Sequence, residues 1–138
     1  MELVQREAAA SREAALNGEV DMIVKDWFAD YPDAENFLYP LLHSANEGVG
    51  GNLSFFANPA FDSLVTRARR EVDEGARHAL YREADALAFD EAPMVFLWFY
   101  DDLYAVQPWI RGFEVPTIFN GQRWTRVRIG PMGGTGQP

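Results

Sequence analysis

The sequence predicts an α/β fold, and three stretches indicate it. Residues 2–17 are rich in Ala and Glu and predict a weakly amphipathic helix, which Asn17-Gly18 would end because Gly adopts a left-handed conformation without a steric penalty. Residues 20–24, "VDMIV", form a short apolar run typical of a strand. Residues 92–100, "APMVFLWFY", form a longer run that we expect to be a strand buried on nearly both faces. A helix followed by Gly and a buried strand is typical of α/β proteins.

A second helix is expected to begin near residue 34. Asp33 stands at its N-cap position, and Glu35 falls in its first turn, where the helix dipole favours an anion. Pro40 lacks the amide hydrogen that a helix interior uses, so we expect a break or kink near residue 39.

Two further helices follow residues 46–56, a glycine-rich stretch that indicates an exposed loop. The first opens with Asn58-Pro59, an N-cap followed by a proline at the first helical position, and the second is predicted over about residues 74–90. Helical periodicity predicts these apolar faces: Phe61, Leu64, Val65, Ala68 and Val72 in the first helix, and Leu80, Ala84, Leu87 and Ala88 in the second.

The C-terminal part is predicted to be mostly extended chain. A turn at residues 101–102 predicts that residues 103–108 return as the second strand of a hairpin. Alternation in residues 122–129 predicts a strand with one solvated face. Residues 130–138, "GPMGGTGQP", have no means of packing and are expected to be disordered, which leaves residues 1–129 as one domain.

The composition excludes several classes of function. A net charge of -9 disfavours nucleic acid, which attracts proteins through clustered Lys and Arg, and the absence of cysteine excludes disulfides, thiolate catalysis and Cys-ligated zinc. The longest apolar run, residues 94–100, is far shorter than the roughly 20 residues that cross a bilayer. The first eighteen residues lack the apolar core of a signal peptide, so no export signal is recognised in this chain.

The residues offer little support for an enzyme. No Gly-x-Ser-x-Gly, P-loop or His-Glu-x-x-His motif occurs, and we expect the two histidines, His43 and His78, to be structural. Asp30 and Asp33 could form the carboxylate pair of a glycosidase. "DYPDAEN" offers oxygen ligands for calcium, but it lacks the spacing and central Gly of an EF-hand. We therefore predict no catalytic residues, no metal and no cofactor.

Residues 26–37, "DWFADYPDAENF", interleave acidic and aromatic side chains directly after the first predicted strand. Open α/β sheets bind ligands at the carboxyl ends of their strands, and an aromatic wall beside a fixed carboxylate suits a ligand with an apolar body and a cationic end. The alternative is that Trp27 and Tyr31 belong to the core and Asp30 is a turn residue. The residues alone leave both interpretations open.

Two stretches, "GEVDMIVKDWFADYPDAENFLYPLLHS" and "NPAFDSLVTRARREVDEGARHALYREADALAFDEAPMVFLWFY", resemble the C-terminal portion of family 5 extracellular solute-binding proteins. These are the peptide-, dipeptide- and nickel-type receptors of bacterial ABC importers. The resemblance covers about residues 15–129. Its ordered parts are Gly18 with Asp21, Trp27 with residues 29–33, residues 58–62, Arg77 with Tyr81, Ala84 and Asp85, and residues 91–93 before the aromatic strand.

The resemblance implies a two-lobed, periplasmic-binding-protein-like fold of type II, to which this chain contributes a C-terminal lobe portion. Residues 122–129 would return toward the other lobe. The implied function is that of a non-enzymatic receptor for peptides or similar small cationic or zwitterionic solutes, and its partner is the membrane permease of an ABC importer. The intact protein would be periplasmic or extracellular, and we expect this chain to be a C-terminal fragment with an incomplete cleft.

In peptide-binding members of the family, the Asp after the Trp-x-Ala step pairs with the α-ammonium group of the ligand, and the Trp lines a side-chain pocket. Val24 stands where some oligopeptide binders place an Arg that meets the peptide carboxylate, so that clamp is absent. Asp26, where many members have Gly, adds negative charge and disfavours anionic ligands. The ligand-binding residues that the resemblance implies are Asp30, Trp27, Phe28 and Tyr31, with Asp26 and Ala29 as secondary candidates.

Two alternatives to a receptor remain. One is a glycosidase-type enzyme that uses Asp30 and Asp33, and the other is a folded remnant or oligomerising domain without ligand function. Half a cleft buries half a ligand, so we expect weak or undetectable binding by this chain alone. An aromatic face that lacks its covering lobe would favour self-association.

Overall fold

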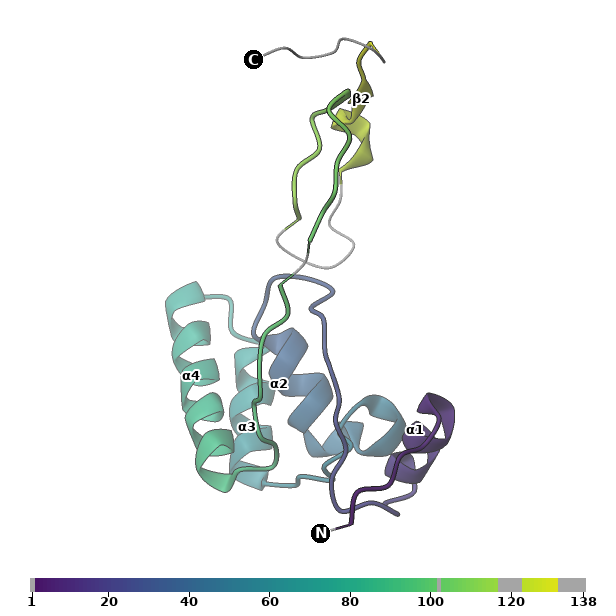
Figure 1. The fold of residues 1–138 in the computed structure, drawn as a ribbon. Coiled ribbons are helices and arrows are strands. Elements are labelled where there is room, and N and C mark those ends of the chain that lie inside the picture. Colours follow the sequence, from purple (N-terminus) through teal and green to yellow (C-terminus); the bar gives the residue numbers. More distant parts are fainter. Residues whose placement is uncertain (1, 102, 117–122, 132–138) are drawn as a thin grey trace. The chain divides into compact units, whose positions relative to one another are not determined.

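In the computed structural model, the described residues are 2–101, 103–116 and 123–131 (Figure 1). The chain divides into two compact units. Met1–Trp27 and Asp33–Phe96 form the first, and Phe28–Pro32 and Leu97–Pro138 form the second. The first unit contains the helices α1 (Ala8–Leu16), α2 (Glu35–Leu42), η1 (Ser44–Asn46), η2 (Gly48–Gly50), α3 (Pro59–Ala68) and α4 (Glu74–Glu91); the second contains β1 (Ile110–Arg111), η3 (Trp124–Arg126) and β2 (Arg128–Ile129).

The core of the first unit lies where α3 and α4 pack against each other and against α2, and the three helices lie side by side in Figure 1. Its buried residues are Leu38, Leu42, Phe61, Leu64, Val65, Ala68, Tyr81, Ala84 and Ala88. Their spacing places them on one face of each helix. In α4, the predicted Ala84 and Ala88 are buried, the predicted Leu80 and Leu87 are partly buried against the core, and Tyr81, which was not predicted, is buried. The predicted face of α3 is confirmed. Val72 is the exception: it is 97% exposed, because α3 ends at Ala68.

The predicted helix ends are largely confirmed. Asn58 Oδ1 accepts hydrogen bonds from the amides of Ala60 (2.9 Å) and Phe61 (3.3 Å), with Pro59 as the first helical residue. α1 begins later than predicted, at Ala8, and ends as expected: Gly18 has φ +67° and its amide donates to Ala15 O.

The predicted break in α2 is wrong. Pro40 lies inside the helix, which continues to Leu42. A proline at this position removes one amide donor and leaves the carbonyl of Asn36, four residues earlier, without its helical partner. The helix continues because the indole N–H of Trp27 donates to that carbonyl.

The glycine-rich stretch is more ordered than the predicted exposed loop. It contains η2, and Asn52 within it is fully buried. The Asn52 amide group donates to Phe56 O (2.9 Å) and Leu42 O (3.3 Å), so its hydrogen bonds tie this stretch to the end of α2. Gly51 has φ +124°, and a Cβ there would lie 2.7 Å from Pro40 O, so only glycine fits.

The strands predicted at residues 20–24 and 92–100 are wrong. Within the described ranges, the named strands are β1 and β2 alone, which pair antiparallel with Ile110 opposite Ile129. The predicted hairpin is also absent where residues 103–108 are described, and Asp102 of its turn lies outside the described residues. The fold is therefore helical with one small sheet.

The last predicted strand is confirmed in part. β2 covers Arg128–Ile129, whereas Trp124–Arg126 form the 3-10 helix η3, and Gln122 lies outside the described residues. Phe113 contacts the rings of Tyr104 and Trp124 at centroid distances of 5.6 and 6.1 Å, so a small aromatic cluster holds this part of the second unit. Most of the predicted tail, residues 130–138, falls outside the described residues.

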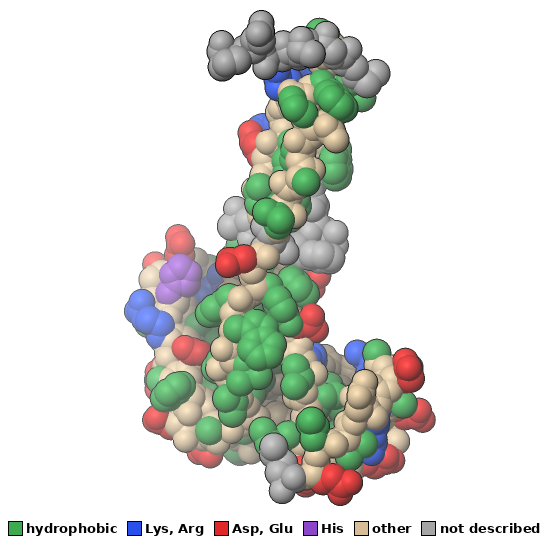
Figure 2. All heavy atoms as spheres, viewed as in Figure 1, with side chains coloured by type: hydrophobic (Ala, Val, Ile, Leu, Met, Phe, Trp, Pro, Cys, Tyr) green, Lys and Arg blue, Asp and Glu red, His purple; other side chains and the backbone are tan. Residues whose placement is uncertain are grey.

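The apolar side chains of residues 95–100 are exposed, with fractions between 59% and 99%. We call this stretch the aromatic segment. A strand is buried on both faces only when neighbouring strands and covering layers supply the partners, and the described part of this chain supplies neither. Figure 2 shows hydrophobic side chains at the surface of both units. The prediction of a doubly buried strand is wrong for this reason.

The aromatic segment predicts self-association of the isolated chain, because an uncovered apolar surface is removed from water when two copies meet. Dimers or larger species are expected by light scattering, and Phe99→Glu should shift them toward monomer. Val72→Glu is the matched control, since Val72 is as exposed as Phe99 but lies in the loop between α3 and α4. A monomeric wild type, or an equal effect of both substitutions, would contradict the role of the segment.

Candidate functional site

The predicted ligand-binding residues are divided between the two units. Trp27 belongs to the first unit, whereas Phe28–Pro32, which include Asp30 and Tyr31, belong to the second.

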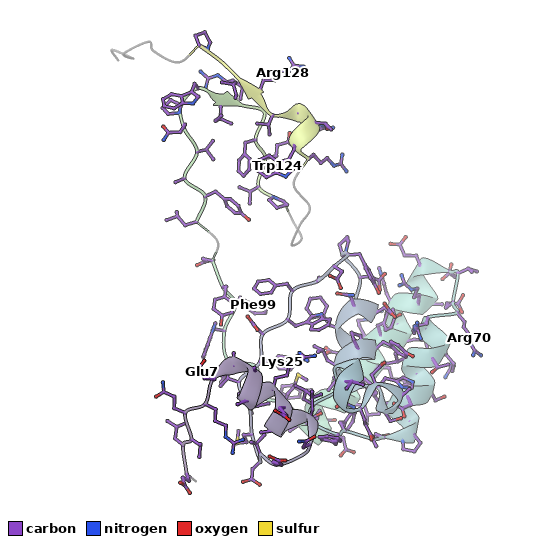
Figure 3. All side chains as sticks on the ribbon, turned by 90° about the vertical axis from the view of Figure 1, so that its right-hand side faces the viewer. Glu7, Lys25, Arg70, Phe99, Trp124 and Arg128 are labelled. Atoms are coloured by element: carbon purple, nitrogen blue, oxygen red, sulfur yellow. The ribbon has the colours of Figure 1, made fainter. Side chains whose placement is uncertain are left out.

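Trp27 is half-buried and held by polar contacts within the first unit. Its indole Nε1 donates a hydrogen bond of 2.8 Å to the backbone carbonyl of Asn36. Lys25, labelled in Figure 3, places its Nζ 5.2 Å from the centre of the Trp27 ring and donates to Gly51 O at 2.8 Å. A cation at this distance is attracted by the face of an indole ring. The Trp27 ring is thus held by a hydrogen bond to Asn36 and by the charge of Lys25.

The bond from Trp27 replaces the one that Pro40 removes. In a regular helix the carbonyl of Asn36 would accept from the amide of residue 40, and proline has no amide hydrogen. Asn36 is 5% exposed, so solvent reaches this carbonyl poorly and an unpaired oxygen would be costly. The indole N–H supplies the missing donor, which explains why α2 tolerates a proline in its interior.

Phe28 and Tyr31 keep much of their ring surface accessible, at 45% and 44% exposure. Phe28 stacks on Tyr100 of the same unit, with ring centroids 6.4 Å apart and an angle of 23° between the planes. Asp30 is exposed between them. Tyr31 is therefore not a core residue in this structure.

The two secondary candidates differ in burial. Asp26 is exposed and precedes Trp27 in the first unit, whereas Ala29 is half-buried in the second. Burial and the nearby charge of Arg12 lower the pKa of Lys25, and the charge of Asp26 opposes this shift.

The N-cap of α2 is Ala34, one residue after the predicted Asp33, which still accepts from the first turn of the helix and has a partner that the sequence did not indicate. Asp33 Oδ1 accepts from the amide of Glu35 at 2.8 Å, and its Oδ2 accepts from Nη2 of Arg77 on α4. Desolvation by burial raises the pKa of Asp33, but the hydrogen bonds from Arg77 and Glu35 and the nearby positive charges outweigh it. The pKa of Asp33 therefore lies below its ordinary value.

Arg69 makes an ionic contact and a ring contact with residues of α2. Glu35 Oε1 lies 2.9 Å from Nε of Arg69, and the Arg69 guanidinium stacks 3.6 Å from the centre of the Tyr39 ring. Arg77 lies over the ring of Tyr81 at 5.2 Å. Arginine suits these positions because its planar guanidinium combines ion pairing with ring stacking. Helical spacing did not reveal the contacts of Arg69, because Glu35 and Tyr39 lie on a different helix.

His43 is a buried structural residue, as predicted. Its Nδ1 accepts from the amide of Ala45 at 3.1 Å, and its Nε2 lies 3.2 Å from Oγ1 of Thr66. Asp62 caps η1: its Oδ1 accepts from the Ser44 amide at 3.1 Å and its Oδ2 accepts from Ser44 Oγ. Because the Ser44 hydroxyl donates to Asp62 and not to the imidazole, this cluster does not have the order of a Ser-His-Asp triad.

Asp33 does not suit the role of general acid in a glycosidase. A general acid must hold its proton near neutral pH, which requires a raised pKa, whereas Arg77 and the Glu35 amide stabilise the ionised form of Asp33. In the described part of the chain, no group of three or more acidic or histidine side chains could hold a metal ion. No helix among the described residues is long and apolar enough to span a membrane.

Comparison with known proteins shows which proteins this chain is similar to. No family model matches the chain. It is 33% identical over 98 residues to the periplasmic murein peptide-binding protein MppA of Escherichia coli (strain K12), covering 71% of this chain and 18% of that protein. It is 27% identical over 113 residues to the periplasmic oligopeptide-binding protein OppA of the same organism, covering 82% and 20%. Heme-binding protein A of Haemophilus influenzae is 35% identical over 92 residues, covering 67% and 17%.

The chain is related to the family 5 solute-binding proteins. The resemblance carried by the Trp27 to Asp33 motif and the later motifs is thereby confirmed. The chain spans about a fifth of the length of the curated relatives it matches. These relatives are named as binding proteins and not as enzymes, and the names of two of them place them in the periplasm.

The energetic coupling between Trp27 and Pro40 can be measured with single and double variants of this chain. Trp27→Phe removes the indole N–H that donates to the Asn36 carbonyl, so we expect a loss of about 1–2 kcal/mol in the free energy of unfolding. Pro40→Ala supplies a helical donor for the same carbonyl. In the Pro40→Ala background, Trp27→Phe should therefore cost less, and urea unfolding of the four proteins gives the coupling. Additive effects would show that the indole bond does not replace the lost helical bond.

The ion pair of Asp33 predicts a pH dependence. Asp33→Asn keeps an acceptor for the Glu35 amide but loses the charge that faces Arg77, so stability at neutral pH should fall by about 1–2 kcal/mol. Because the folded-state pKa is lowered, the unfolded chain binds the proton first as pH falls. The wild-type advantage should be complete above the ordinary value of 3.8 and disappear as pH falls through the lower folded-state pKa. An advantage that does not change with pH would exclude the charge as its source.

Proposed function

We propose that the chain is part of a solute-binding receptor of a bacterial ABC importer, and that the receptor takes peptides or similar small solutes with a cationic ammonium group. The chain would contribute a C-terminal lobe portion, residues 1–129, to a two-lobed fold of type II, with residues 122–129 returning toward the other lobe. The intact receptor would act in the periplasm or at the cell exterior and deliver its ligand to a membrane permease. The relation to MppA, which covers 71% of this chain, carries the proposal.

Asp30 is the residue that we propose to bind the ammonium group. It is an exposed carboxylate flanked by two half-exposed aromatic residues, Phe28 and Tyr31. A carboxylate gives a charge-assisted hydrogen bond to an ammonium group, and that bond strengthens when closure of a cleft removes water. The aromatic faces offer apolar surface to the rest of the ligand. For Trp27, the family resemblance implies a side-chain pocket for the ligand.

The class of ligand follows from charge as well as from relatives. The relatives are named for murein peptides, oligopeptides and heme, so the family relation alone does not select a ligand. Asp26 and Asp30 place two negative charges in residues 26–31, next to the one positive charge of Lys25, which favours a cationic end over an anionic one. Val24 provides no positive charge for a peptide carboxylate, so recognition should depend on the amino end of the ligand.

The proposal is tested on the longer receptor that contains this chain, by calorimetric titration with trialanine and with N-acetyl-trialanine. The free peptide should bind and the acetylated peptide should not, because acetylation removes the ammonium charge. Asp30→Ala should weaken binding of the free peptide by about 10- to 100-fold, the equivalent of one charged hydrogen bond.

Asp90→Asn is the matched control, since Asp90 is an exposed acid on α4 outside the candidate residues. It should bind as the wild type does. Unchanged affinity in Asp30→Ala would remove Asp30 from the site. Equal binding of both peptides would exclude recognition of the ammonium group.

A further inference from the structure

The segment Phe28–Pro32 is flanked by two hydrogen-bonded contacts of the first unit. Immediately before it, Trp27 donates its indole N–H to the Asn36 carbonyl at 2.8 Å. Immediately after it, Asp33 accepts from Arg77 and from the Glu35 amide. We call these the two flanking contacts. They lie at both ends of the five residues that carry Asp30.

Both flanking contacts end on rigid parts of the helical core. Asn36 is buried in the first turns of α2. Arg77 extends from α4, which packs against α3 and α2, and its guanidinium lies over the ring of the buried Tyr81. The side chains of Asp33 and Arg77 are only 23% and 27% exposed, so solvent screens their attraction less than it would on an open surface. The ends of the segment are therefore fixed by groups that cannot easily move.

We propose that Asn36 and Arg77 are positioning residues for ligand binding: through Trp27 and Asp33 they hold the two ends of Phe28–Pro32 and so present Asp30 in a narrow set of conformations. This inference rests on the proposed function, in which Asp30 binds the ammonium group. A short segment with both ends fixed loses much of its conformational freedom before a ligand arrives, so less entropy is lost on binding. Functional groups are positioned well when the residues that support them are themselves held by packing.

Pro40 becomes part of this arrangement. Its lack of an amide hydrogen keeps the Asn36 carbonyl available to Trp27, so a residue that disfavours a helix interior makes the first flanking contact possible. The second contact depends on Asp33, whose two carboxylate oxygens have separate partners. Loss of either contact should loosen one end of the segment, although no ligand-facing residue changes.

The test measures backbone order parameters by NMR relaxation for the amides of residues 28–31 in the 138-residue chain without ligand. Values near about 0.85 are expected in the wild type, and values below about 0.6 in Arg77→Gln. Asp33→Asn keeps the acceptor for the Glu35 amide and should give the same loss of order. Arg82→Gln, the same substitution at an exposed position of α4, should leave the order parameters unchanged. If the wild type self-associates, all variants are measured in the Phe99→Glu background.

A purely structural role of Arg77 would lower the free energy of unfolding but leave the order parameters of the folded protein unchanged, and that result would overturn the inference. If Arg77→Gln does not fold, Arg77→Lys and Asp33→Asn supply the measurement.

Affinity for trialanine is measured separately in the longer receptor. Order that falls in the variants while trialanine does not bind the wild type would support positioning and reject the proposed function. Trialanine binding with unchanged order would do the reverse.

Discussion

The backbone carbonyl of Asn36 is the point on which the arrangement around the candidate residues depends. Pro40 removes its helical donor, and burial of Asn36 makes an unpaired oxygen costly, so a donor from outside the helix is required. The indole of Trp27 meets that requirement. One backbone acceptor thus joins a helix that would otherwise be interrupted to the chain that leads into Phe28–Pro32. Trp27 consequently has a structural role that does not depend on any ligand.

The helices could be predicted from the sequence because their determinants are local. Asn58-Pro59 begins α3 and Gly18 ends the turn after α1, and apolar spacing identified the faces that pack. The strands could not be predicted in this way. Residues 92–100 have the composition of a buried strand, but a strand forms only when another chain segment pairs with it, and apolar composition does not reveal whether that partner is present. The relatives are about five times longer than the matched stretch.

Around the candidate residues, only contacts between sequence neighbours could be predicted. The helix-starting positions of Asp33 and Glu35 follow from their sequence neighbours, whereas the pairing of Asp33 with Arg77 joins residues 44 positions apart and has no local pattern. Burial of Asn52 inside a glycine-rich stretch was equally hidden, since only the carbonyls left free at the end of α2 explain it. The ligand role of Asp30 depends on the family relation and remains our proposal.

The distribution of these contacts has a kinetic consequence. α3 and α4 are neighbours in sequence and share most of the core, so their packing requires little loop closure, and contacts of this kind form fast. The pair between Asp33 and Arg77 requires a far longer closure and a docked α2 before its two groups can meet. We expect the helical core to assemble first and the residues around Asp30 to be ordered late. A nascent chain would therefore hold a stable core before the segment that carries Asp30 is ordered.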